Sequence, residues 1–89
     1  MRFRKKPVVI EAFKLSDLST DQTMMLPGWV LPAIMDGTIA IGPDGTAIVK
    51  TLEGQHIAQA DDWIIQGVKG ELYPCKPDIF AATYELVAQ

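Results

Sequence analysis

Two side chains of this sequence are of the types that perform nucleophilic or metal chemistry, the single cysteine Cys75 and the single histidine His56. They could act as a nucleophile and its base only if the fold brought them together. A free cysteine in a strand more often packs as a small hydrophobic side chain, and His56 has no partners at metal-ligand spacing. His56 is therefore interpreted as a surface strand residue. We expect no catalytic activity, no metal site and no cofactor.

A second set of side chains could bind a ligand without transforming it. Aromatic rings offer flat stacking surfaces, and lysine or arginine offers phosphate contacts, so that together they suit a nucleotide. An ordinary amphipathic sheet displays the same combination, which leaves a purely structural interpretation open. The candidate ligand-binding residues are Arg4, Lys5, Lys6, Trp63, Lys69, Tyr73, Lys76 and Tyr84.

The neighbours of these candidates have structural interpretations. The segment Gly67-Val68-Lys69-Gly70 has the spacing of a hairpin turn and not of a phosphate-binding loop. The adjacent carboxylates Asp61 and Asp62 precede a strand-forming run, and we expect them to cap and solvate the strand end.

The charge of the chain is unevenly distributed. The net charge is −3, but residues 2–6 carry four positive side chains, and the remainder has four positive against eleven acidic residues, which gives −7. This balance argues against binding of DNA or RNA polymers, which requires a broad basic surface. The basic start either solvates the end of an edge strand or holds a small anion.

Size and composition predict a single small domain, residues 1–89, that associates with itself. The chain has 89 residues and is 48% hydrophobic, with a mean hydropathy of +0.14. A core of this size leaves apolar surface uncovered, and self-association is the usual remedy. One cysteine, no signal peptide and no membrane-spanning segment favour the cytoplasm.

The secondary structure that must position the candidates is predicted as follows. A strand over 7–14 places Val8, Ile10 and Ala12 on its core face. Residues 15–28 form a loop with one helical turn near 20–25, and Met24, Met25 and Leu26 suit an oligomer interface.

Glycine and proline residues indicate where the predicted helices and strands of the rest of the chain begin and end. A short helix over 28–37 ends at Gly37 in the left-handed conformation, and a second helix begins at Lys76 and Pro77. Strands are predicted over 38–41, 46–52, 55–58, 63–66, 71–75 and 83–87. The fold class is α+β: a small, mostly antiparallel β-sheet or barrel-like domain with one or two short helices.

Two segments resemble a widespread family of small phage and prophage proteins. The opening segment contains RKKPVVIEAF at residues 4–13, and the closing segment is DWIIQGVKGELYPCKPDIF at 62–80, followed by TYE at 83–85. Together they cover less than half of the chain, and the closing segment is the more specific. Asp61 departs from the pattern, because a glycine is common there, and this puts the turn before Trp63 in doubt.

The resemblance extends to phage anti-defence sponges, which sequester the cyclic dinucleotide signals of the bacterial CBASS immune system. It implies a non-enzymatic homo-oligomer, a tetramer, that binds cyclic GMP-AMP-like messengers without cleaving them. An assembly with two-fold symmetry would suit a ligand with two phosphates and two bases. The alternative is a phage structural or adaptor protein that binds a host or virion protein through a methionine, leucine and tryptophan surface.

Overall fold

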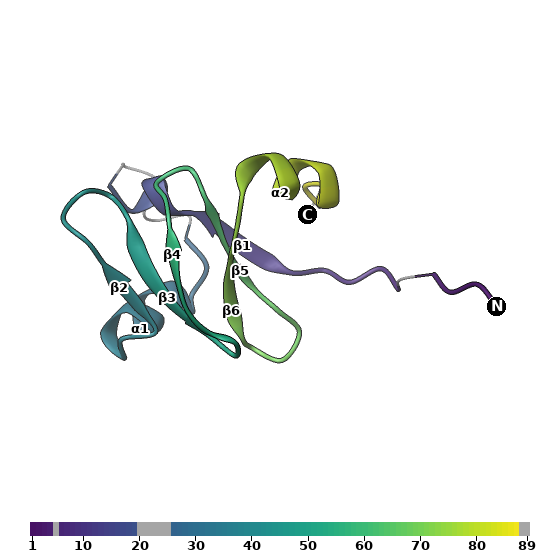
Figure 1. The fold of residues 1–89 in the computed structure, drawn as a ribbon, viewed down its shortest axis with the longest axis horizontal. Helices are drawn as coiled ribbons and strands as arrows, with labels where there is room; N and C mark the ends of the chain where they lie inside the picture. The colour runs from purple at the N-terminus through teal and green to yellow at the C-terminus, as the bar shows by residue number, and fades with distance from the viewer. Residues whose placement is uncertain (5, 20–25, 88–89) are drawn as a thin grey trace.

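Six β-strands, two α-helices and one 3₁₀ helix make up the computed structural model, which describes residues 1–4, 6–19 and 26–87 (Figure 1). Within those residues the strands form two three-stranded antiparallel sheets, without closing into a barrel. The predicted α+β class is confirmed.

The first sheet has the strand order β1-β5-β6. Its strands are β1 (Glu11–Lys14), β5 (Trp63–Gln66) and β6 (Leu72–Cys75). On the central strand β5, Ile64 and Ile65 point to opposite faces, and both side chains are fully buried. Both faces of this sheet are therefore covered. The tight turn that joins β5 to β6 is the predicted hairpin, and Gly70 has the left-handed φ of +83° that such a turn favours.

The second sheet has the order β2-β3-β4 and is covered on one face only. Its strands are β2 (Ile39–Ile41), β3 (Ala47–Thr51) and β4 (Gly54–Ala58). Along β3 the side chains alternate, with Ala47 and Val49 buried and Ile48 and Lys50 exposed. This alternation is the pattern of an antiparallel strand with one solvated face.

The helices are short. α1 (Val30–Met35) buries Val30 and Ala33 and is followed by Gly37 at φ +86°, as predicted. α2 (Pro77–Thr83) begins with a proline in its first turn, also as predicted, and has no fully buried residue. The 3₁₀ helix η1 (Leu15–Ser19) follows β1 directly.

The core lies between the two sheets and is closed by α1. Its members come from both sheets and from the segments that join them. They are Phe13, Leu15, Val30, Ala33, Ile39, Ala47, Val49, Ala58, Ile64 and Leu72.

The first predicted strand is shorter than expected, and its core face was assigned wrongly. β1 starts only at Glu11, because its last partner on β5 is Gln66 and the hairpin turn begins at the next residue. Phe13, paired with Ile64, is the buried residue, whereas Val8 is 49% exposed. The described residues before Glu11, 1–4 and 6–10, belong to no strand, and this part of the chain leaves the sheet as an arm (Figure 1).

The end of the chain also differs from the prediction. The expected strand over 83–87 is absent: Thr83 ends α2, and 84–87 have no regular structure. Tyr84 does adopt an extended backbone, with φ −123° and ψ 152°, but it packs against α2 instead of pairing with a strand. The helical turn expected near 20–25, with Met24 and Met25, lies outside the described residues.

No helix in the described ranges is long and apolar enough to cross a lipid bilayer.

Candidate functional site

The structure divides the predicted ligand-binding residues into two groups. Trp63, Tyr73, Lys76 and Tyr84 lie around the contact between β5, β6 and α2. The others that the structure describes stand apart: Lys69 in the β5–β6 turn, and Arg4 and Lys6 on the N-terminal arm. Lys5 lies outside the described residues.

The three aromatic candidates are joined by a fourth ring, that of Phe80. Trp63 and Phe80 stack with their centroids 4.3 Å apart and their planes at 2°, and Phe80 and Tyr84 lie 5.1 Å apart at 36°. The hydroxyl oxygens of Tyr73 and Tyr84 are 3.5 Å apart. Phe80 therefore anchors α2 to the sheet and covers one face of Trp63. The candidate residues predicted from the sequence did not include Phe80.

Lys76 is held by a buried carboxylate. Its ammonium donates to both oxygens of Asp62, at 3.3 Å and 3.0 Å, and the Asp62 side chain is 4% exposed whereas that of Lys76 is 56% exposed. The backbone N–H of Gln59 donates to the same carboxylate at 2.9 Å. The prediction that Asp62 is solvated at a strand end is wrong, because these donors satisfy the carboxylate inside the protein. Asp61 is exposed.

The other candidate cations that the structure describes, Arg4, Lys6 and Lys69, are exposed to solvent. Lys69 lies at the tip of the hairpin, where its backbone N–H donates to Glu71 Oε2 at 3.0 Å. Arg4 and Lys6 project from an arm that leads away from both sheets (Figure 1). Within one copy, the arm cations and the aromatic cluster are therefore not brought together.

Cys75 is in an environment that opposes thiolate formation. Burial raises the pKa of the thiol, and the nearby carboxylates of Asp62 and Asp78 raise it further. A nucleophilic cysteine needs the opposite shift. His56, as predicted, is an exposed residue of strand β4.

Tyr73 is perturbed in the same direction. Burial raises the pKa of its phenol to about 12, with the hydrogen bond to Tyr84 as the second cause. The phenol is therefore neutral across the physiological range, and it acts as a hydrogen-bonding group of the aromatic cluster.

Two cavities open beside the β5–β6 hairpin. The first, of about 340 Å³, lies between the β3–β4 turn and β6 and is lined by apolar side chains together with His56, Glu53 and Glu71. The second, of about 380 Å³, lies under α1 beside Trp29. Neither cavity includes Trp63 or Lys76. Across the described ranges, no cluster of three or more histidine, cysteine or acidic residues is placed to hold a metal ion.

Comparison with protein-family models, curated proteins and solved structures found no match to this chain.

Proposed function

We propose that this chain is a non-enzymatic phage protein that binds and sequesters cyclic GMP-AMP-like immune signals in the cytoplasm of the infected cell, working as a homo-oligomer such as a tetramer. The observation that carries the proposal is the gathering of three candidate rings and one candidate cation, those of Trp63, Tyr73, Tyr84 and Lys76, at one end of the first sheet. Stacking rings beside a cation suit a base and its phosphate.

The geometry sets conditions on how a ligand would bind there. Phe80 already stacks on Trp63 in the parallel arrangement that a nucleobase would need, so a base must use the other face of the indole or displace α2. Lys76 is neutralised by Asp62, and a phosphate would have to share its ammonium with that carboxylate. Further positive charge must therefore come from Lys69 or from the arm of another copy. This requirement favours an assembly over a single chain as the binding unit.

The test is calorimetric titration of the full chain with a panel of cyclic di- and trinucleotides. We expect sub-micromolar binding of at least one member and recovery of the nucleotide unchanged after release. Absence of binding across the panel would refute sequestration, and hydrolysis of the nucleotide would identify an enzyme.

Lys69→Ala is the cleaner cation variant. Lys69 is exposed, and the hydrogen bond from its backbone N–H to Glu71 does not depend on the side chain that is removed. We expect the affinity for the nucleotide to fall about tenfold, since charge-assisted hydrogen bonds contribute roughly 1.5–3 kcal/mol. Lys50→Ala, which removes an exposed cation from the second sheet, is the matched control. Equal affinities of the two variants would exclude Lys69 from the site.

Lys76→Ala must be interpreted together with a stability measurement. The substitution leaves the Asp62 carboxylate buried without its cation, which destabilises the fold as well as any ligand contact. Lys76→Arg keeps the charge near Asp62 while changing the donor geometry. Weaker binding by Lys76→Arg at unchanged stability would assign Lys76 to the ligand.

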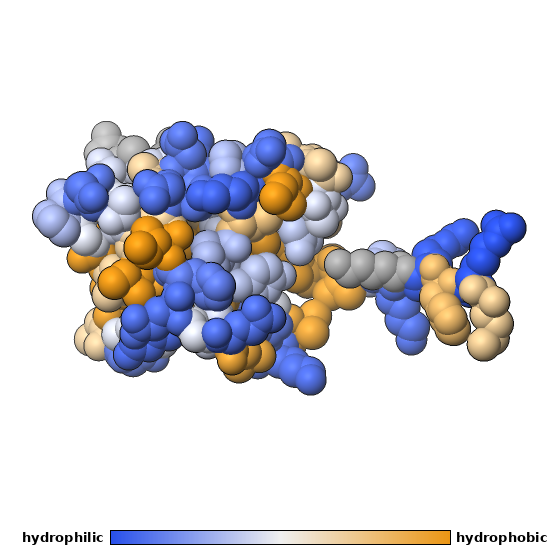
Figure 2. Space-filling model, in the orientation of Figure 1, coloured by the Kyte–Doolittle hydropathy of each residue, from blue (hydrophilic) through white to orange (hydrophobic). Residues whose placement is uncertain are grey.

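A second candidate function, an adaptor for a host or virion protein, is favoured by one observation. The cross-strand row Ala40, Ile48 and Ile57 lies on the bare face of the second sheet, where the two isoleucines are 42% and 65% exposed. Figure 2 shows hydrophobic residues at the surface in the region of this sheet. The tryptophan of the predicted adaptor surface is used differently, because Trp29 packs against Phe13 and donates to Glu11.

A further inference from the structure

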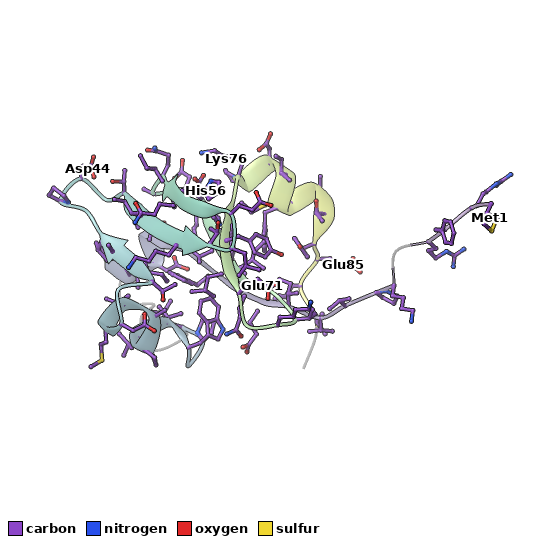
Figure 3. All side chains as sticks on the ribbon, turned by 60° about the horizontal axis from the view of Figure 1, so that its bottom comes forward. Met1, Asp44, His56, Glu71, Lys76 and Glu85 are labelled. Carbon is purple, nitrogen blue, oxygen red and sulfur yellow. The ribbon has the colours of Figure 1, made fainter. Side chains whose placement is uncertain are left out.

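The N-terminal arm carries apolar side chains that nothing in its own copy covers. Phe3 is 89% exposed and Val9 75% exposed, and the residues described before Glu11 belong to no helix or strand. Figure 3 shows Met1 at the far end of the arm, away from the labelled residues of the two sheets. Met1 and Val8 are exposed on the same segment, and exposed apolar side chains that gather in one place mark a contact with another molecule.

The arm is stiff where it leaves the sheet. Pro7 restricts both its own backbone and that of Lys6 to extended conformations, and Val8, Val9 and Ile10 are three successive β-branched residues. No glycine is available for a reversal. At roughly 3.3 Å per residue, Phe3 reaches up to about 26 Å beyond Glu11. The arm therefore leads away from its own body, as its course in Figure 1 shows.

The cavity between the β3–β4 turn and β6 has the complementary character. Its apolar lining comes from Leu52, Leu72 and Pro74, and Leu52 is 83% exposed. Two acidic residues, Glu53 and Glu71, also line this cavity, and the Glu71 carboxylate accepts a hydrogen bond from the backbone N–H of Lys69. The volume of about 340 Å³ is in the range of pockets that hold an organic ring system.

We propose that this cavity receives the N-terminal arm of a second copy of the chain. The Phe3 ring enters the apolar lining, and Arg2 and Arg4 on either side of it pair with Glu53 and Glu71. The arm presents one ring between two cations, and the cavity presents an apolar surface with two carboxylates. The charge of the whole chain matches this arrangement, since residues 2–6 carry +4 and the remainder −7.

A second copy is the occupant because every chain carries both the arm and the cavity that would receive it. If each copy places its arm in the cavity of the other, both cavities are filled in a closed two-fold dimer. Such a dimer is the commonest symmetric assembly. The inference goes beyond sequestration: it assigns Arg4 to the contact between copies and leaves Lys5 and Lys6 as the arm residues for a phosphate. A full chain that assembles through the arm but binds no member of the nucleotide panel would refute the proposed function alone.

The first test measures association of the full chain by light scattering and native mass spectrometry. We expect a dimer or a multiple of it, and Phe3→Ala should weaken association at least tenfold, as a buried aromatic anchor does. Leu86→Ala, an equally exposed apolar residue at the other end of the chain, is the control and should change nothing. Neither substitution removes a core contact, so folding is preserved.

The second test exchanges the charges. The double variant Arg2→Glu/Arg4→Glu and the single variant Glu53→Lys should each be monomeric alone, because each places like charges opposite one another. Mixed together they should form a heterodimer, since each arm then faces a cavity of opposite charge. Glu85→Lys, which reverses an exposed acid outside the cavity, should not rescue the double variant.

Three outcomes would overturn the inference. A full chain that stays monomeric at about 100 µM has no such contact. An assembly that is unchanged by Phe3→Ala uses another surface, such as the bare face of the second sheet. Failure of the charge-exchanged pair to associate would show that the carboxylates of the cavity do not receive the arm.

Discussion

The two sheets have the same number of strands and the same antiparallel pairing, but they differ in how their faces are covered. The sheet β1-β5-β6 has no bare face along its central strand, because Ile64 and Ile65 point to opposite faces and are both fully buried. The sheet β2-β3-β4 buries Val49 against the core and leaves Ile48 and Ile57 exposed.

This difference separates two kinds of apolar residue in a small domain. The isoleucines of β5 contribute to the stability of a single copy, because burying them removes apolar area from water within the chain. The isoleucines on the bare face of β3 and β4 contribute nothing comparable in one copy and are available to another molecule. The high hydrophobic content therefore does not all belong to one core.

The sharpest test of the comparison is truncation of one isoleucine on each sheet. Ile65→Ala should lower the free energy of unfolding by about 2–5 kcal/mol, because it leaves a cavity at a fully buried position of β5. Ile48→Ala should change it by less than about 0.5 kcal/mol, as for a surface residue. Denaturant titration measures both values at a protein concentration where only one copy is present. Similar losses in the two variants would show that the bare face of the second sheet is covered.

The packing of α2 against the first sheet can be weakened without substituting a strand residue. Phe80→Ala removes the ring that stacks on Trp63 and should cost about 1–3 kcal/mol, less than a fully buried phenylalanine because Phe80 is only partly buried. Ile79→Ala, on the same helix and 55% exposed, is the matched control and should be nearly neutral. Amide hydrogen exchange in α2 should accelerate in Phe80→Ala only. Unchanged protection would mean that other contacts hold the helix.

The smallest predicted effect is on alkaline stability, and it also arises at the covered face. The pKa of Tyr73 is about 12 in the folded chain, whereas that of an unfolded tyrosine is near 10.0. Between these values the unfolded state binds fewer protons, so stability falls as the pH rises. The raised pKa of Cys75 acts in the same direction from its ordinary value of 9.0 upward.

Tyr73→Phe isolates the tyrosine contribution. The variant should lose less stability than the parent chain between about pH 10 and 12, measured as the denaturant midpoint at each pH. Ultraviolet absorbance of the ionised phenol should follow the same titration. Equal pH dependence of variant and parent would mean that Tyr73 is not protected from solvent.

Much of the local structure was predictable, because turn chemistry acts within a few residues. Gly37 and Gly70 have the left-handed φ that ends a helix or closes a hairpin, and Pro77 begins α2. The strand predicted over 46–52 is β3, Ala47–Thr51. The apolar run of β5 indicated a strand as well, but its neighbours and the cover on each face were not determined by that run.

What the sequence could not give are the facts that depend on a distant partner. Residues 7–10 have the composition of a strand, yet they form none because β5 turns away at Gly67, so that no strand faces them. Asp62 has the appearance of a solvated acid, and only the approach of Lys76 makes it a buried ion pair. Trp63 and Tyr84 were expected to offer free ring surfaces, and only the placement of α2 decided that Phe80 lies against both.

The sequence alone was enough to predict the turns at Gly37 and Gly70, the strands β2 to β6, the start of α2 and the positive charge at the beginning of the chain. These properties follow from backbone preferences and composition, which act locally. The tertiary structure alone decided which faces are covered, which charges are paired and where the basic arm points, because each depends on residues that are far apart in the chain.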